Sequence, residues 1–102
     1  NMKNLKELKL TRNKIGDEGV EALAASENLS AITFMDLSAN EISDRGALAI
    51  ANSPRFSNLK TLDLYNNHIS TEGMKALLNS KNLKSLEKLI LVELFRTFQT
   101  FI

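Results

Sequence analysis

The sequence lacks cysteine and tryptophan altogether, and its 102 residues include one proline, one histidine and four glycines. The absence of cysteine excludes disulfide bonds and thiolate zinc sites, and it leaves the redox compartment open. Neither sign of charge prevails, because 13 basic residues stand against 12 acidic ones and the net charge is +1. Such a balance predicts no nucleic-acid partner and no anionic membrane surface.

Long apolar runs and cofactor motifs are missing as well. No apolar stretch approaches the roughly 18 residues that a membrane-spanning helix needs, and the N-terminus "NMKNLKELKL" does not read as a signal peptide. The sequence has no phosphate-binding loop, no dinucleotide-binding fingerprint and no His-Glu-x-x-His motif. We therefore expect no cofactor, no metal, no enzymatic activity and no membrane partner. A cytoplasmic location is expected, with a secreted effector as the alternative.

What the sequence does contain is an internal repeat. The segments 4–26, 31–53 and 58–80 align without insertion, at a step of 27 residues (59 minus 32, for example). An asparagine column and a glycine column keep the same step, at Asn13, Asn40, Asn67 and at Gly19, Gly46, Gly73. A register held through so many columns indicates one repeated structural unit. The length of the whole chain, 102 residues, suits a single domain.

Each unit reads L-x-x-L-x-L-x-x-N-x-I, followed by a segment of the form x-x-x-G-x-x-A-L. This pattern resembles the leucine-rich repeat family, and it is closest to the longer, ribonuclease-inhibitor-like class. The resemblance covers residues 5 to about 91. It implies an α/β solenoid, a short right-handed arc with parallel strands on the concave side and helices on the convex side. We expect a repeat domain over 1–93, with about three and a half repeats, and a separate tail over 94–102.

Local chemistry predicts the same elements. Apolar residues alternate at Leu8/Leu10, Met35/Leu37, Leu62/Leu64 and Leu89/Leu91, as in short strands with one buried face. Ser43 and Ser70 are expected to cap the N-termini of two helices, each with an acidic residue close by. The recurring glycine, unfavourable inside a helix, indicates a place of close approach.

The Asn-Asn-His cluster at 66–68 invites a catalytic or metal-binding interpretation. The resemblance implies instead that Asn67 turns inward and bonds backbone groups, in a ladder with Asn40 and Asn13. Asn66 is expected to be exposed. His68 is expected to be a solvated loop residue, because a single histidine is a poor zinc site.

Function on this scaffold is expected from the residues between the leucines, which face the concave side. Two aromatic residues and a group of charges occupy such positions, namely Phe34, Tyr65, Lys9, Asp36, Asp63 and Arg12. The aromatics are candidate anchors for a protein partner, or they cover aliphatic surface or contact another copy. The two aspartates form an acidic spot that receives a lysine or arginine, or they are ordinary solvated surface.

The repeat pattern breaks in the tail, where apolar residues gather at Leu94, Phe95, Phe98 and Phe101. The tail is expected to cap the last repeat, to form a homo-oligomer, or to end as an apolar segment that favours aggregation. We predict a non-catalytic module that binds a protein partner on the concave face. The alternatives are a structural fragment that self-associates through the tail and the open solenoid ends, and part of a small-GTPase regulator or effector, a role that the resemblance suggests.

Overall fold

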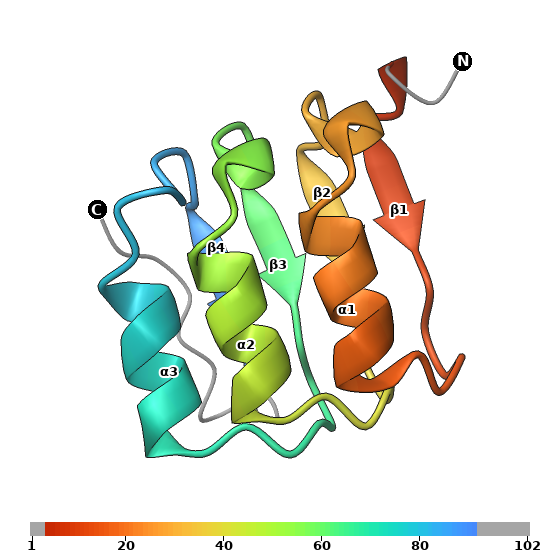
Figure 1. Ribbon diagram of the computed structural model, residues 1–102, viewed down its shortest axis with the longest axis vertical. Helices are drawn as coiled ribbons and strands as arrows, with labels where there is room; N and C mark the ends of the chain where they lie inside the picture. Colours follow the sequence, from red (N-terminus) through yellow and green to blue (C-terminus); the bar gives the residue numbers. More distant parts are fainter. Residues whose placement is uncertain (1–3, 92–102) are drawn as a thin grey trace.

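The computed structural model describes residues 4–91. Within this range four short strands form one parallel sheet in the order of the chain: β1 (Glu7–Lys9), β2 (Phe34–Asp36), β3 (Thr61–Asp63) and β4 (Lys88–Ile90). Three helices lie side by side over one face of this sheet (Figure 1): α1 (Gly16–Ala24), α2 (Asp44–Ala51) and α3 (Thr71–Leu78). Two 3-10 turns, η2 (Glu27–Leu29) and η3 (Pro54–Phe56), follow α1 and α2.

The register of the sheet equals the period of the sequence. Leu8 pairs with Met35, Met35 with Leu62, and Leu62 with Leu89, each step being one repeat. Every column of the repeat therefore becomes a row of neighbouring side chains across the sheet. The predicted α/β solenoid of stacked strand–helix units is confirmed.

The core lies between the sheet and the helices. The inward strand residues Met35, Leu62 and Leu89 are fully buried, as is Ile50 of α2. Phe56 of η3 is fully buried too, a role that the repeat pattern did not predict. Burial of this kind stabilises a fold by about 25 cal/mol for each Å² of apolar surface removed from water.

Serine caps the second and third helices, as predicted. The Ser43 hydroxyl accepts the Arg45 N–H at 3.3 Å, and the Ser70 hydroxyl accepts the Glu72 N–H at 3.3 Å. Helix α1 has Ile15 at the equivalent place and no side-chain cap. The first helix therefore begins without the hydroxyl that its neighbours use.

The starts of α2 and α3 are also held by an aspartate of the preceding helix. Asp17 accepts the Ser43 N–H at 2.8 Å, the Ser43 hydroxyl at 2.5 Å and the Gly46 N–H at 3.0 Å. Asp44 makes the matching contacts with the N–H and the hydroxyl of Ser70. An aspartate at the N-terminus of one helix thus satisfies backbone donors of the next, where the helix dipole favours a negative charge.

The aspartate contacts explain the glycines at 46 and 73, whereas a Cβ atom at Gly19 would meet only Ile15. A Cβ atom at Gly46 would lie 2.6 Å from the Asp17 Oδ1 atom, and one at Gly73 would lie 2.5 Å from the Asp44 Oδ1 atom. The predicted need for close approach is confirmed. Its main cause is the neighbouring carboxylate together with the preceding isoleucine, Ile42 or Ile69.

None of the helices within residues 4–91 has the length and apolarity needed to cross a membrane. The tail with Leu94, Phe95, Phe98 and Phe101 lies outside the described residues. Its capping or self-associating role, and the boundary at residue 93, therefore stay predictions.

Candidate functional site

The candidate site is the outer strand face, the side of the sheet turned away from the three helices (Figure 1). Side chains alternate along a strand, so the neighbours of the buried leucines point to this face. The register aligns them in two rows: Glu7, Phe34, Thr61, Lys88 and Lys9, Asp36, Asp63, Ile90. Thr11, Ser38 and Tyr65 follow two residues after the second row.

The two aromatic residues are half-buried rather than exposed, which corrects the expectation from the sequence. Phe34 begins β2 and lies under the ammonium group of Lys9, whose Nζ atom is 5.7 Å from the ring centroid. Tyr65 stands two residues beyond the end of β3. The register therefore places their Cα atoms about 14 Å apart, from four residues along the strand and one strand across. They would act as two separate anchors rather than one aromatic cluster.

Between the anchors lies Asp36, which bonds within its own chain. Its Oδ1 atom accepts the Ser38 N–H at 3.0 Å and the Ser38 hydroxyl at 2.7 Å. Partial burial raises the pKa of Asp36, but hydrogen bonds from Ser38 and Thr11 and the attraction of Lys9 outweigh it. The pKa of Asp36 is therefore lowered, and this carboxylate stays ionised.

The pKa of Asp63, which pairs with Asp36 on the neighbouring strand, is shifted in the opposite direction. Its Oδ1 atom accepts the Tyr65 N–H at 3.0 Å. Burial raises the pKa of Asp63 and the facing Asp36 raises it further, while the Tyr65 N–H and Lys88 act against the shift and do not cancel it. The two aspartates thus repel one another across the paired strands. A cation placed over this pair would relieve both the repulsion and the burial cost.

Both aspartates also shape the backbone where the strand ends. Each accepts the N–H two residues ahead, an arrangement that fixes a local turn. This role was not predicted from the sequence, although an aspartate at the end of each of two successive strands is a signal for it.

The basic residues of the predicted site lie at its β1 side. The Nζ atom of Lys9 is 3.9 Å from the Glu7 Oε1 atom, and the Lys9 side chain is largely exposed. Arg12 is exposed and has a left-handed backbone with φ of 63°, as do Ala39 and Asn66 one and two periods later. The structure thus brings Lys9 beside Asp36 and Phe34, and it places Arg12 in the loop beyond the strand.

The asparagine ladder is confirmed as scaffold. Asn40, fully buried, accepts the N–H groups of Asn13 and Ile15 at 2.8 and 3.3 Å and donates to the carbonyl oxygens of Leu10 and Ser38. The Asn67 amide makes the equivalent bonds one period later, two of them with the backbone N–H groups of Asn40 and Ile42.

The rest of the cluster is exposed, as predicted. Asn66 is exposed, and so is His68, whose backbone N–H donates to the Ile42 carbonyl. Within residues 4–91, no three His, Cys, Asp or Glu side chains gather as a metal site would require. Of the Asn-Asn-His cluster, Asn67 is thus a scaffold residue, and Asn66 and His68 are exposed loop residues.

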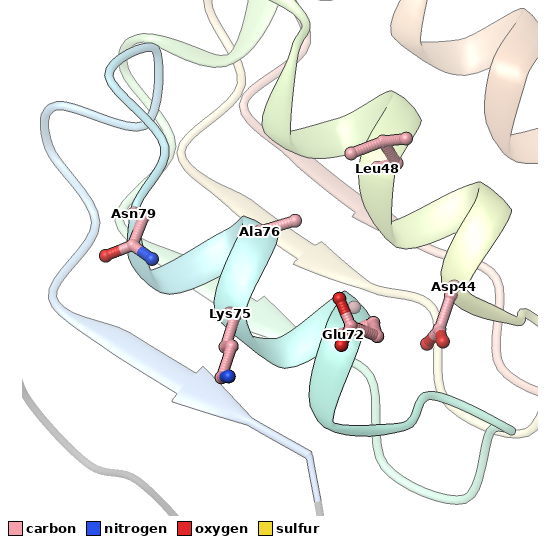
Figure 2. Close-up of a pocket in the computed structure, with 7 residues that line it drawn as sticks. Asp44, Leu48, Glu72, Lys75, Ala76 and Asn79 are labelled. Carbon is pink, nitrogen blue, oxygen red and sulfur yellow. The ribbon is translucent and has the colours of Figure 1, made fainter.

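A shallow groove on the opposite, helical side of the molecule is a second concave feature. Figure 2 shows Leu48 of α2 beside Ala76 of α3, with Asp44, Glu72, Lys75 and Asn79 also in its lining. Leu48 is 50% exposed. The Asp44 carboxylate is occupied by Ser70, so the groove offers a small apolar surface rather than a reactive group.

Comparison with known proteins identifies the repeat independently. A family model described as Leucine Rich repeat matches residues 1–24, 32–51 and 57–78. A search of curated proteins gave no significant match. Six solved chains match, among them a Caenorhabditis elegans tropomodulin C-terminal domain with a TM-score of 0.62 and 25% identity. That match covers 89% of this chain, and the chain spans 55% of that domain's length.

Proposed function

Because the chain belongs to the leucine-rich repeat family, whose repeats generally mediate protein–protein interactions, we propose that it is a non-catalytic interaction module. It binds a protein partner on the outer strand face, which the family resemblance places on the concave side of the arc. The tropomodulin C-terminal domain supports the repeat architecture of this proposal and does not identify the partner.

The observation that carries this proposal is that residues paired on neighbouring strands are 27 positions apart, which is the period of the repeat. It places the variable positions of successive repeats side by side on the sheet face that the helices leave uncovered. Side chains that differ between repeats, on strands of one regular sheet, are what a protein-binding surface needs. Phe34 and Tyr65 serve as the two apolar anchors, because aromatic side chains contribute much of the binding energy in interfaces.

The charged residues of this surface determine which groups of a partner it would attract. Asp36 and Asp63 repel one another and would be relieved by a lysine or arginine of the partner. Lys9 and Arg12 stand on the β1 side and would contact an acidic group. Four strands about 4.8 Å apart give this face a width on the order of 20 Å. A standard interface buries roughly 800 Å² on each partner, which corresponds to a square about 28 Å on a side. A modest affinity is therefore expected.

The test is partner capture by the immobilised chain, with the captured proteins identified by mass spectrometry. Replacing Phe34 and Tyr65 together by alanine should abolish capture while the circular dichroism spectrum stays unchanged. Leu48→Ala is the matched control, because Leu48 is an exposed apolar side chain on the helical side. Capture retained by the double variant, or lost in Leu48→Ala, would reject the assignment of the outer strand face.

A further inference from the structure

An ion pair joins α1 and α2 on the helical side of the molecule. The Arg45 guanidinium donates to both carboxylate oxygens of Glu21, from its Nε and Nη2 atoms, at 2.8 Å each. A bidentate pair of this kind is geometrically specific as well as favourable. One repeat later, Glu72 of α3 stands in the place of Arg45, and Leu48 of α2 stands in the place of Glu21. These two positions therefore cannot form the equivalent ion pair between α2 and α3.

The groove between α2 and α3 lies at this place. It has a volume of about 350 Å³, with Leu48 and Ala76 as its apolar wall and Glu72 beside them (Figure 2). Leu48 is 50% exposed. Within residues 4–91, the Glu72 carboxylate forms no ion pair, and Figure 2 shows Lys75 directed away from Leu48. The groove thus combines an apolar wall with a carboxylate that lacks a cationic partner in the described part of the chain.

A second carboxylate adds to the negative charge of the groove. Asp44 also lines it, and its oxygen atoms accept the N–H and the hydroxyl of Ser70. These hydrogen bonds lower the pKa of Asp44, so this side chain is ionised. Its oxygen atoms are already bonded within the chain, whereas the exposed Glu72 carboxylate can bond to a ligand.

We infer that this groove binds an arginine side chain of a second protein partner. The aliphatic stem of the arginine lies on Leu48 and Ala76, and its guanidinium donates to both oxygen atoms of Glu72. Arginine suits the site because its stem packs on apolar surface while its planar head bonds a carboxylate through two parallel N–H groups. A lysine would supply the charge without the bidentate contact.

The chain itself supplies the precedent for this contact. The Glu21–Arg45 pair joins a carboxylate and a guanidinium across the same helical surface, one repeat earlier. In the groove the carboxylate comes from α3, and Leu48 leaves the opposite charge to a partner. A wholly apolar occupant would cover Leu48 but would also take the Glu72 carboxylate out of water without a partner, which is unfavourable. The inference concerns another surface and another ligand than the proposed partner binding, and it does not depend on it.

The experiment is a nuclear magnetic resonance titration of the isotope-labelled full chain with the tripeptide N-acetyl-Ala-Arg-Ala amide. The backbone amide signals of Leu48, Glu72 and Ala76 should shift and reach saturation. The same tripeptide with citrulline, which has nearly the shape of arginine and no charge, should bind roughly fivefold more weakly, as expected for the loss of one exposed ion pair. A lysine tripeptide should bind with an affinity between the two.

Variants of the chain test the assignment to Glu72 and Leu48. Glu72→Gln should abolish the difference between the arginine and citrulline peptides, because glutamine carries no charge. Glu87→Gln changes an exposed glutamate next to β4 and outside the groove, so it is the matched control and should keep the difference. Leu48→Arg should place a guanidinium of the chain itself over Glu72 and prevent peptide binding. Leu48→Ala should weaken peptide binding and leave partner capture by the outer strand face unchanged, so the two proposals fail independently.

Any of four results would overturn the inference, provided that circular dichroism shows each variant to be folded. The first is the absence of shifts at Leu48, Glu72 and Ala76. The second is a citrulline or lysine peptide that binds as tightly as the arginine peptide. The third is peptide binding that persists in Leu48→Arg, which indicates another site. The fourth is a shift of the groove signals with protein concentration alone, which indicates that a second copy of the chain covers the groove.

Discussion

Replacing Asn40 by alanine should destabilise the protein far more than the same replacement at Asn13, although both residues occupy the same place in the repeat. The Asn40 side chain is fully buried and makes four hydrogen bonds to backbone groups. Asn13 is exposed, and its amide donates to the Thr11 carbonyl at 3.2 Å. The pair thus compares a side chain that joins two repeats with one that bonds only within its own loop.

The magnitude follows from the groups that each substitution leaves unpaired. At Asn40, the N–H groups of Asn13 and Ile15 and the carbonyl of Leu10 lose their partner, whereas the Ser38 carbonyl still accepts the Arg12 N–H at 3.1 Å. Each buried unpaired group costs about 1–3 kcal/mol, and water reaching the half-buried Leu10 lowers the total. We expect a loss of about 2–4 kcal/mol for Asn40→Ala and about 0.5 kcal/mol or less for Asn13→Ala.

The assay is urea unfolding of both variants and the wild type, followed by circular dichroism. The midpoint should fall strongly for Asn40→Ala and hardly for Asn13→Ala, with the slope unchanged. Equal losses at the two positions, or a loss below about 1 kcal/mol at Asn40, would refute the view that the ladder stabilises by joining successive repeats.

Three further substitutions test other parts of the structure, each by urea unfolding. Ala39→Asn should stabilise by about 0.5–1 kcal/mol, because asparagine tolerates the left-handed φ of 57° better than alanine; no gain would contradict this. Gly73→Ala should destabilise by about 1–3 kcal/mol, since its Cβ atom would displace the Asp44 carboxylate; an unchanged midpoint would reject the glycine argument. Asp63→Asn should stabilise by about 0.5 kcal/mol at neutral pH, because it removes the repulsion from Asp36. Because the pKa of Asp63 is raised on folding, protonated Asp63 contributes stability in acid, and this contribution is lost as the pH rises through that pKa. The gain from Asp63→Asn should therefore vanish at a pH below the pKa of Asp63. A gain that persists in acid would contradict the raised pKa.

Much of the scaffold could be predicted from the sequence because the repeat has no insertion. Leu8, Met35, Leu62 and Leu89 are one period apart, so their pairing in the sheet follows once each is placed in a strand. The family resemblance, rather than the period, implied that Asn40 lies in a buried ladder. Phe56 was missed because it falls in a turn that the repeat pattern leaves unspecified.

The site was harder to predict, because its properties depend on contacts between repeats. The pairing of Asp36 with Asp63 could be read from the period, but their opposite pKa shifts depend on burial and on hydrogen bonds from Ser38 and Tyr65. Likewise, the aspartate at each helix start reaches the next helix only because glycine lets the two helices approach. Such distances follow from packed coordinates and not from spacing along one chain.

The most direct test of the proposed function is to locate the bound partner on the surface. A photo-crosslinking amino acid placed at Thr61, in the row of Phe34 on the outer strand face, should form an adduct with the captured protein. The same probe at Leu48, on the helical side, should form none, and the Thr61 adduct should disappear when Phe34 and Tyr65 are both alanine. A partner that crosslinks at Leu48 and not at Thr61 would contradict binding on the outer strand face.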